Sequence, residues 1–268
     1  MSVRKFAALI GAGLLLAGVP VATAQAAPAA TATVSVLHGV PGATVDVYAN
    51  GKKLLTNFKP GTLTDPLQLP EGDYDLKVTA AGKTAALIQA NDVAVPGGAN
   101  VTVVAHLDAG GKPVLTPFVN DTSKLAAGQA RLTVRHTAAA PAVDVRAGGK
   151  PVFKDLTNPK QAKADLPAGT VKADVVLAGT STVALGPADV NLKEGTNTIV
   201  YAWGSASAKN LKLAVQTISG LHGTPSGVPG GTGGQAATQQ QPVWPALVAG
   251  LLALVLVGGG AAAIRVRA

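Results

Sequence analysis

The sequence predicts an all-β protein: two tandem antiparallel β-sandwich domains followed by one C-terminal transmembrane helix. Short runs rich in Val and Thr alternate with turn residues through the middle of the chain, which is typical of a β-sandwich. The same series of runs occurs twice. A long apolar segment lies near the end of the chain, and its length suits a membrane helix.

The N-terminal segment predicts a secretory signal peptide over residues 1–26. Arg4 and Lys5 precede an apolar run over 6–22, and Ala-Gln-Ala follows at 24–26. A basic start, an apolar core and a small-x-small cleavage site are the three parts of such a signal. An uncleaved N-terminal anchor is the alternative, and the position of the cleavage site directly after the apolar core argues against it. We therefore expect export of the chain.

An internal repeat divides the middle of the chain into two domains, at 27–122 and 129–220, with a linker at 123–128. Three blocks keep their order and spacing in both copies, at offsets of 98, 97 and 97 residues. The paired blocks are Val34–Leu55 with Leu132–Phe153, Leu69–Val78 with Leu166–Val175, and Gly97–His106 with Glu194–Trp203. Chance similarity between Ala/Val-rich segments would not keep three blocks in register.

Each copy is predicted to consist of short strands in an immunoglobulin-like or transthyretin-like arrangement. The runs are four to seven residues long, often alternate polar with apolar residues, and lack the i, i+3, i+4 pattern of a helix. In the first copy the expected strands are Thr31–Leu37, Thr44–Tyr48, Lys52–Phe58, Pro66–Leu69, Tyr74–Thr79, Thr84–Ala90, Val101–Leu107 and Pro113–Phe118.

The repeated Val-Asp-Val segment predicts the first arm of a β-hairpin. Asn50-Gly51 is the favoured dipeptide of a two-residue type I′ turn, and Gly148-Gly149 replaces it in the second copy. The return strands begin at Lys52 and Lys150, where a long solvated side chain is ordinary. The motif is therefore interpreted as scaffold.

The C-terminal part predicts a stalk and an anchor. Residues 221–242 contain no charge and abundant Gly, Pro, Gln and Thr, a composition that cannot form a core. Residues 243–264 are apolar and long enough to cross a bilayer, and a buried core helix is the alternative. The tail, 265–268, carries two arginines, which predict a cytoplasmic end by the positive-inside rule. We expect a single-pass cell-membrane protein with its N-terminal domains outside the cell.

Composition excludes several kinds of site. The chain has no cysteine, so disulfides, thiol catalysis and Cys-based metal sites are absent. The formal charge is +8, but four positive charges lie in the signal and the tail. Aromatic residues make up 3%, too few for the stacking surface of a nucleic-acid binder. The remaining charge is uneven, at −2 over 28–122 and +5 over 129–220. We interpret these charges first as solvated faces. The alternatives are contact between the copies, or contact of the basic copy with anionic lipid or wall polymer.

Two His/Asp pairs are the candidate ligand-binding residues. His38 and Asp46 recur as His136 and Asp144, eight residues apart in both copies. If the loop between them closes a hairpin, the imidazole can donate to the carboxylate and hold the loop. A ligand, metal or acid–base pair is the alternative. Two ligands are too few for a tight zinc or calcium site, and no third one recurs, so neither a metal nor a cofactor is expected.

The sequence also lacks the motifs of common hydrolases and nucleotide-binding enzymes. It contains no G-x-S-x-G, no H-E-x-x-H, no P-loop and no dinucleotide fingerprint. We expect a non-enzymatic surface protein that serves adhesion, envelope structure or ligand capture, with a cell-wall polymer or a surface protein as partner and an undetermined oligomeric state. The alternative is an envelope hydrolase or metal-dependent enzyme that uses the His/Asp pairs.

The blocks "LHGVPGATVDVYANGKKLL", "LPEGDYDLKV" and "GGANVTVVAHLD" resemble the domain-of-unknown-function family DUF4397. The resemblance extends over about 190 residues as two tandem copies and is more specific in the first copy. In the second, Arg146 stands where the pattern favours an aromatic residue, and Ala139 replaces Pro41. The resemblance implies an extracytoplasmic β-sandwich, and the layout is similar to that of an actinobacterial cell-surface protein. It implies no activity and no site residues.

Overall fold

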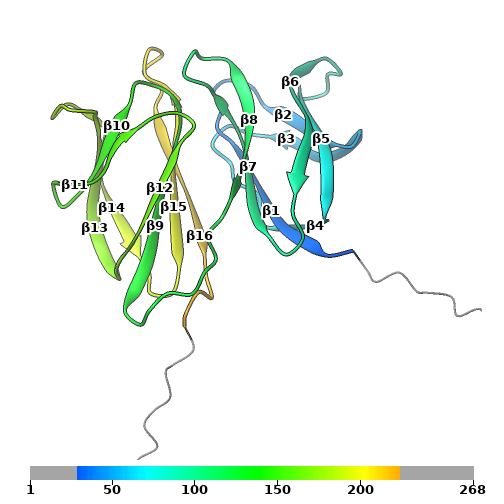
Figure 1. Ribbon diagram of the computed structural model, residues 1–268. Helices are drawn as coiled ribbons and strands as arrows, with labels where there is room; N and C mark the ends of the chain where they lie inside the picture. Colours follow the sequence, from blue (N-terminus) through cyan, green and yellow to red (C-terminus); the bar gives the residue numbers. More distant parts are fainter. Residues whose placement is uncertain (1–28, 224–268) are drawn as a thin grey trace, which may run out of the picture. The chain divides into compact units, whose positions relative to one another are not determined.

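A computed structural model of the protein describes residues 29–223, and this part is built from sixteen β-strands in two sandwich-like units (Figure 1). Within 29–223 no helix is long and apolar enough to span a membrane. The predicted signal peptide (1–26), transmembrane helix (243–264) and tail (265–268) lie outside the described residues, as does the stalk from residue 224 onward.

The first sandwich contains β1 to β8, in two four-stranded sheets with the orders β4-β1-β7-β8 and β3-β2-β5-β6. The strands are β1 (Thr31–His38), β2 (Val45–Ala49), β3 (Lys52–Phe58), β4 (Leu67–Pro70), β5 (Gly72–Ala80), β6 (Ala86–Val95), β7 (Asn100–Leu107) and β8 (Pro113–Val119). All eight predicted strands are present. The boundaries differ most in β6, which runs five residues beyond the predicted end.

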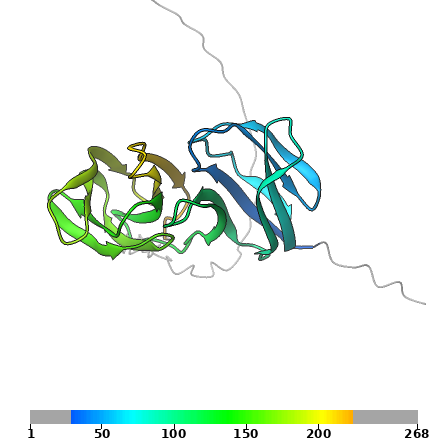
Figure 2. The same ribbon diagram turned by 90° about the horizontal axis from the view of Figure 1, so that it is seen from above.

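The second sandwich repeats this arrangement strand for strand, with the orders β12-β9-β15-β16 and β11-β10-β13-β14. Its strands are β9 (Gln129–Ala139), β10 (Val143–Ala147), β11 (Lys150–Leu156), β12 (Gln161–Pro167), β13 (Gly169–Leu177), β14 (Val183–Leu192), β15 (Asn197–Ser205) and β16 (Lys212–Ile218). Each unit is a pair of layered sheets when seen from above (Figure 2).

The sandwiches are not purely antiparallel, and the prediction was wrong in this respect. β1 pairs in parallel with β7, and β9 pairs in parallel with β15. The chain leaves this sheet after β1, returns to it for the antiparallel β4, and returns again for β7 in the direction of β1. Alternation of polar and apolar residues shows which face of a strand is buried but carries no information on strand direction.

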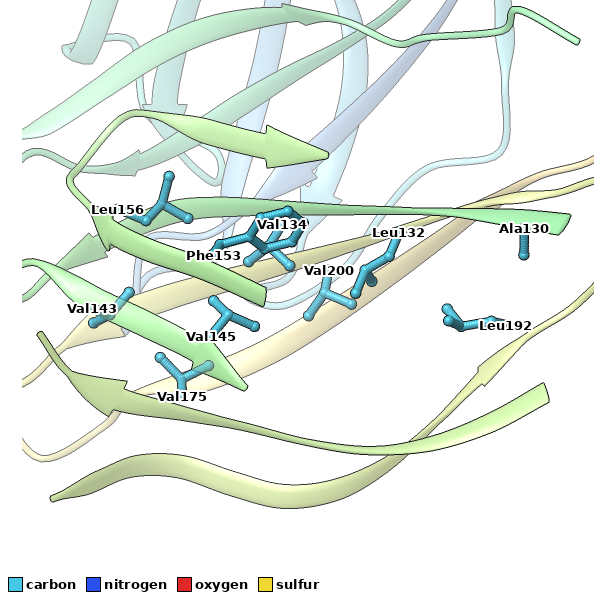
Figure 3. Packing of buried hydrophobic residues seen from close by; sticks show 10 residues of the cluster. All are labelled: Ala130, Leu132, Val134, Val143, Val145, Phe153, Leu156, Val175, Leu192 and Val200. Atoms are coloured by element: carbon cyan, nitrogen blue, oxygen red, sulfur yellow. The ribbon is translucent and has the colours of Figure 1, made fainter. Parts of the chain in front are cut away.

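Each sandwich encloses an apolar core between its two sheets. In the second sandwich, side chains from β10, β11 and β13 meet those of β9 and β15, as Figure 3 shows. The labelled core residues are Ala130, Leu132, Val134, Val143, Val145, Phe153, Leu156, Val175, Leu192 and Val200. Burial of each large aliphatic side chain contributes about 1.5–3 kcal/mol, so a disulfide-free unit of this size can be stable on packing alone.

The predicted hairpin turn forms in both copies. Asn50 and Gly51 have φ of 49° and 76°, and Gly148 and Gly149 have φ of 57° and 76°. Two successive left-handed residues define a type I′ turn, whose twist matches that of the flanking strands. The turn joins β2 to β3 and β10 to β11.

The two sandwiches also pack against each other through the outer faces of the sheets that contain β1 and β9. β7 contacts both β9 and β15, and both sandwiches fall within one compact unit. A buried apolar cluster crosses the junction, formed by Leu37, Val104 and Phe118 of the first copy with Ile199 and Tyr201 of the second. Both faces of β9 are therefore buried, which explains its nearly continuous burial.

Ordered contacts continue past Gly220, where the second domain was expected to end. Leu221 is buried, and His222 forms an isolated bridge with Leu125. Leu125 lies in the segment predicted to be a linker, and it too is buried. Both segments thus belong to the packed structure of the second sandwich.

Candidate functional site

The first repeated histidine fastens the loop between β1 and β2. His38 is 1% exposed at the end of β1. Its Nε2 donates to the carbonyl oxygen of Ala43 at 2.8 Å, and its Nδ1 accepts weakly from the Val40 amide at 3.4 Å. This pattern requires the neutral ring with its proton on Nε2. Burial lowers the pKa of His38, and the bond to Ala43 partly opposes this effect.

The second copy repeats this geometry at the end of β9. His136 Nε2 donates to the carbonyl oxygen of Pro141 at 2.9 Å, and the Ala138 amide approaches Nδ1 at 3.4 Å. His136 is also 1% exposed, and burial lowers its pKa. In both histidines, each of the two ring nitrogens therefore faces a backbone group that lies two or five residues further along the chain.

Asp46 holds a bulge and a turn around β2. Its carboxylate accepts from the amides of Asn57 at 2.9 Å and Gly82 at 3.2 Å, and from Lys53 Nζ at 2.8 Å. Asn57 has a left-handed backbone with φ of 52°, and its amide is thereby aimed at the carboxylate rather than at the strand ladder. The hydrogen bond from Lys53, followed by those from the two amides, lowers the pKa of Asp46 to about 2.

Asp144 binds the equivalent two backbone amides of the second copy but has no lysine partner among the described residues. It accepts from the amides of Asp155 at 2.9 Å and Gly179 at 3.1 Å. Asp155, like Asn57, is left-handed, with φ of 53°. Pro151 stands in the second copy where Lys53 stands in the first, and within 29–223 no lysine forms an ion pair with Asp144. The two amide bonds lower the pKa of Asp144.

The predicted hydrogen bond between histidine and aspartate within each copy does not form. β1 and β2 belong to different sheets, so the loop between them crosses the sandwich instead of closing a hairpin. His38 and Asp46 consequently bind separate backbone groups, and His136 and Asp144 do the same. The interpretation as structural residues is compatible with these bonds, but the proposed partner was wrong.

Nothing among residues 29–223 gathers the ligands of a metal site, since no three His, Asp or Glu side chains come together there. The carboxylates of the "EGDYD" segment are likewise dispersed along the start of β5. The Asp75 carboxylate accepts from the Asp92 amide at 3.2 Å, and the Tyr74 hydroxyl donates to the Pro70 carbonyl at 2.8 Å. These contacts fix a bulge and a turn.

The most elaborate polar cluster lies at the junction of the two sandwiches, and the sequence did not predict it. Its centre is Arg135 of β9, which is 1% exposed. The guanidinium donates to Gln161 Oε1 at 2.9 Å, to the Tyr201 hydroxyl at 2.7 Å and to Asn120 Oδ1 at 2.8 Å. It also lies over the Phe118 ring, 4.5 Å from the ring centroid. All three acceptors are neutral, so burial lowers the pKa of Arg135.

Two further contacts tie the copies together around this cluster. The Tyr201 hydroxyl and Thr102 Oγ1 both donate to Gln216 Oε1, at 2.6 and 2.9 Å. At the loop end of the sheets, Asn158 Nδ2 donates to the carbonyl oxygens of Leu107 and Ala138, at 2.8 and 2.6 Å. Asn158 thus bridges one strand of each sandwich.

Trp203 packs into the loops of the first copy. A Cβ on Gly61 would lie 2.9 Å from Trp203 Cζ2, and a Cβ on Gly39 would lie 3.2 Å from Trp203 Cβ. Only glycine allows this approach at residue 61, which also has a left-handed φ of 79°.

One signal in the sequence could have pointed to this junction. Arg131, Thr133 and Arg135 alternate along a Val-rich strand and so share one face of it. Such polar alternation is ordinarily interpreted as a solvated face, and the basic charge of the second copy was interpreted in that way.

Comparison with known proteins shows which family the first copy is similar to. Residues 32–146 match the family model described as "Domain of unknown function (DUF4397)". This segment is similar to DUF4397 domains. The match covers the first sandwich and ends in β10, so membership of the rest of the second sandwich stays a prediction from the internal repeat. The DUF4397 description assigns no activity.

No curated protein matches the chain. Among solved structures, the Bacillus anthracis TIE protein matches with 14% sequence identity and a TM-score of 0.23. The match covers 68% of this chain and 34% of that protein. The chain thus spans about a third of the length of that structure.

Proposed function

We propose that this protein is a non-enzymatic, membrane-anchored module that works outside the cell as an adhesive, ligand-binding or envelope-structural element. The proposal depends on the hydrogen bonds that the four candidate site residues form. His38 and His136 are bound to backbone groups of the loops that follow them, and Asp46 and Asp144 are bound to backbone amides of the neighbouring strand and of a nearby turn. None presents a free polar atom to a shared cleft, as a general base, nucleophile partner or metal ligand must.

Export and anchoring are supported by the two ends of the sequence. The segment 1–26 has the layout of a signal peptide, and 243–264 has the length and composition of a membrane helix. The absence of cysteine is compatible with an extracytoplasmic protein because two well-packed cores replace disulfides.

A tag after Ala268 tests this topology. In intact cells, we expect added protease to remove the sandwiches and leave the tag protected. Digestion of the tag under the same conditions, with a cytoplasmic marker intact, would contradict the anchored arrangement.

The partner class follows from the charge of the second sandwich. Six of its lysines are exposed and form no ion pair within 29–223, in contrast to Arg131, Arg146 and Lys172. These six are Lys150, Lys154, Lys160, Lys193, Lys209 and Lys212. An anionic envelope polymer or an acidic surface protein would match this positive charge electrostatically.

Binding to isolated cell envelope tests the partner class. We expect the two-sandwich segment to be retained at low salt and released as salt is raised. The triple variant K150Q/K154Q/K160Q should lose most of the retention. The matched control is K52Q/K59Q/K83Q, which removes three exposed lysines from the first sandwich. Equal loss in both variants, or no retention of the wild type, would refute an anionic partner of the second sandwich.

A further inference from the structure

The second sandwich has an apolar slot between β14 and β16, where the first sandwich packs β6 against β8. In the first, β6 packs against β8, and Ile88 and Val93 of β6 are buried there. In the second, β14 and β16 make at most marginal contact, and the corresponding residues, Leu185 and Val190, are only half-buried. The mouth of the slot lies between β14 and β16, and its lining includes Leu185, Ala188, Val190, Val200 and Leu213.

Exposed apolar side chains are concentrated on the strands that border this slot. The large hydrophobic residues that are exposed within 29–223 are Leu87, Val119, Val183, Leu213 and Val215. Three of these five lie on β14 or β16. Leu213 and Val215 are 36% and 55% exposed although they project from β16 on the face that carries the core of the sandwich. Such a patch on a soluble surface marks an interaction site.

The backbone of β16 is free along the same edge. Among the strands of residues 29–223, β16 is the last of its sheet and pairs only with β15. The first copy shows which backbone groups point outward. Pro117 of β8 stands opposite Val103, and Val215 of β16 stands opposite Val200, at the equivalent ladder position. Pro117 has no N–H to donate to β7. The backbone N–H and C=O of a residue at this ladder position therefore point outward, away from the neighbouring strand.

It follows that Val215 directs both its N–H and its C=O outward. Leu213 and Thr217, two residues away on either side, do the same. The equivalent edge of the first sandwich is protected, because β8 contains Pro113 and Pro117 and is covered by β6. β16, with the sequence KLAVQTI, has no proline, and its one charged residue, Lys212, stands at its first position. The rest of the strand therefore lacks the prolines and charges by which edge strands usually avoid association.

We propose that β16 is a homotypic association site, at which β16 of a second copy adds in antiparallel orientation around a twofold axis through Val215. Val215 then pairs with Val215 of the second copy, and Leu213 pairs with Thr217 of the second copy. None of these outward-facing residues is charged, and Lys212 lies opposite Ile218 of the second copy, so no like charges meet. The strand is therefore complementary to itself, which is the requirement for an isologous contact.

The same pairing fills the apolar slot. Side chains at 213 and 215 of both copies project from the same face of the joined sheet. Leu213 and Val215 of the second copy thus lie beside those of the first, at the slot mouth that β14 leaves open. One contact thus pairs the outward backbone groups of β16 and buries its exposed apolar side chains. The joined sheet has eight strands, four from each copy.

Thiol cross-linking in the full-length chain tests the pairing, since the protein contains no cysteine. Paired residues in an antiparallel ladder have Cα atoms about 5.5 Å apart at a hydrogen-bonded pair, within the range that a disulfide bridges. We expect Val215→Cys to form a disulfide-linked dimer on mild oxidation. Val119→Cys is the matched control because Val119 is 59% exposed on the edge strand of the first sandwich. Pairing should make cross-linking on the order of tenfold or more faster at 215, through the higher effective concentration of the two thiols.

A second pair of variants separates strand pairing from random collision. Leu213→Cys/Thr217→Cys should also cross-link between copies, and addition of Val215→Pro should abolish this because it removes the central N–H. The proline is compatible with the fold, since Pro117 occupies the equivalent position, and an unchanged melting temperature will verify it. Cross-linking at 215 no faster than at 119, or cross-linking that survives Val215→Pro, would overturn the proposal. A protein that stays monomeric at the concentrations of the assay would likewise overturn the second copy as the occupant of this edge.

Discussion

At the scale of single residues, the repeated histidines show how a pattern that suggests chemistry can serve the fold. His38 and His136 sit at the same point of their copies, and each binds one carbonyl oxygen through Nε2. Protonation of the ring would add a second N–H at Nδ1, which faces a backbone amide in both copies. The neutral form is thus the one that fits.

These histidines predict a loss of stability in mild acid. Their pKa values are lowered by burial, so the unfolded chain binds protons more readily than the folded one. Their contribution is complete above the ordinary histidine pKa near 6.5 and is lost as the pH falls below it. Thermal melts at pH 8 and pH 5 should differ, and the difference should shrink in His38→Gln/His136→Gln. A difference unchanged by the double substitution would contradict this origin.

Removal of either ring should also act on stability alone. His38→Ala creates a cavity beside Phe58, whose ring centroid lies 5.8 Å away, and leaves the Ala43 carbonyl without its donor. A cost of about 2–4 kcal/mol in the free energy of unfolding is expected from the lost packing and hydrogen bond. Chemical denaturation measures it. A variant of unchanged stability that has lost a measurable turnover or a bound metal would instead support the enzyme alternative.

The two aspartates provide an internal comparison, because only Asp46 has a lysine partner. Asp46→Asn should destabilise the protein more than Asp144→Asn at pH 7, since it weakens three bonds instead of two. The advantage of the wild-type carboxylate at 46 is present above the ordinary pKa of about 3.8 and is lost as the pH falls towards about 2. Melting temperatures of both variants from pH 7 to pH 2 check this order. Equal losses of melting temperature in the two variants would show that Lys53 adds nothing to the stability that Asp46 provides.

At the scale of elements, local sequence signals predicted the strands and the hairpin turns well. Lys52–Phe58 was predicted with its observed bounds, and the Asn50-Gly51 turn has the expected left-handed backbone. These features depend on neighbouring residues. The parallel pairing of β1 with β7 and the crossing of the β1–β2 loop between sheets depend on the path of the whole chain, and the sequence did not reveal them.

The turn glycine gives a test at this scale. Gly51 has φ of 76°, and a Cβ added to it would have no neighbouring atom within 4 Å. Gly51→Ala should therefore cost about 1–2 kcal/mol from backbone strain alone. Gly110→Ala is the control, because Gly110 lies in a turn without a left-handed φ. If the two variants unfold at the same denaturant concentration, the strain argument fails.

At the scale of the whole molecule, the two copies share an architecture but use one outer face differently. Leu37 and Val104 of the first copy correspond to Arg135 and Tyr201 of the second, and the two sets meet in one junction. A repeat predicts that two copies exist; it does not predict which faces pack together. The polar residues of the junction therefore escaped prediction although all of them were visible in the sequence.

Substitution of the central arginine should separate the copies. Arg135→Ala removes the donor to Asn120 Oδ1 and to the Tyr201 hydroxyl, and it removes the cation over Phe118. A loss of about 3–5 kcal/mol is expected from buried polar groups left unpaired. Arg146→Ala, which removes only the ion pair with Asp174 on the outside of the second sandwich, should cost far less. Urea denaturation of both variants measures the contrast, and similar losses would contradict a buried junction.

Differential scanning calorimetry of the wild-type protein tests the joined pair of sandwiches most directly. We expect one cooperative transition, with equal calorimetric and van't Hoff enthalpies, that splits into two in Arg135→Ala. Two independent transitions in the wild-type protein would show that the sandwiches unfold separately and would contradict a joined pair.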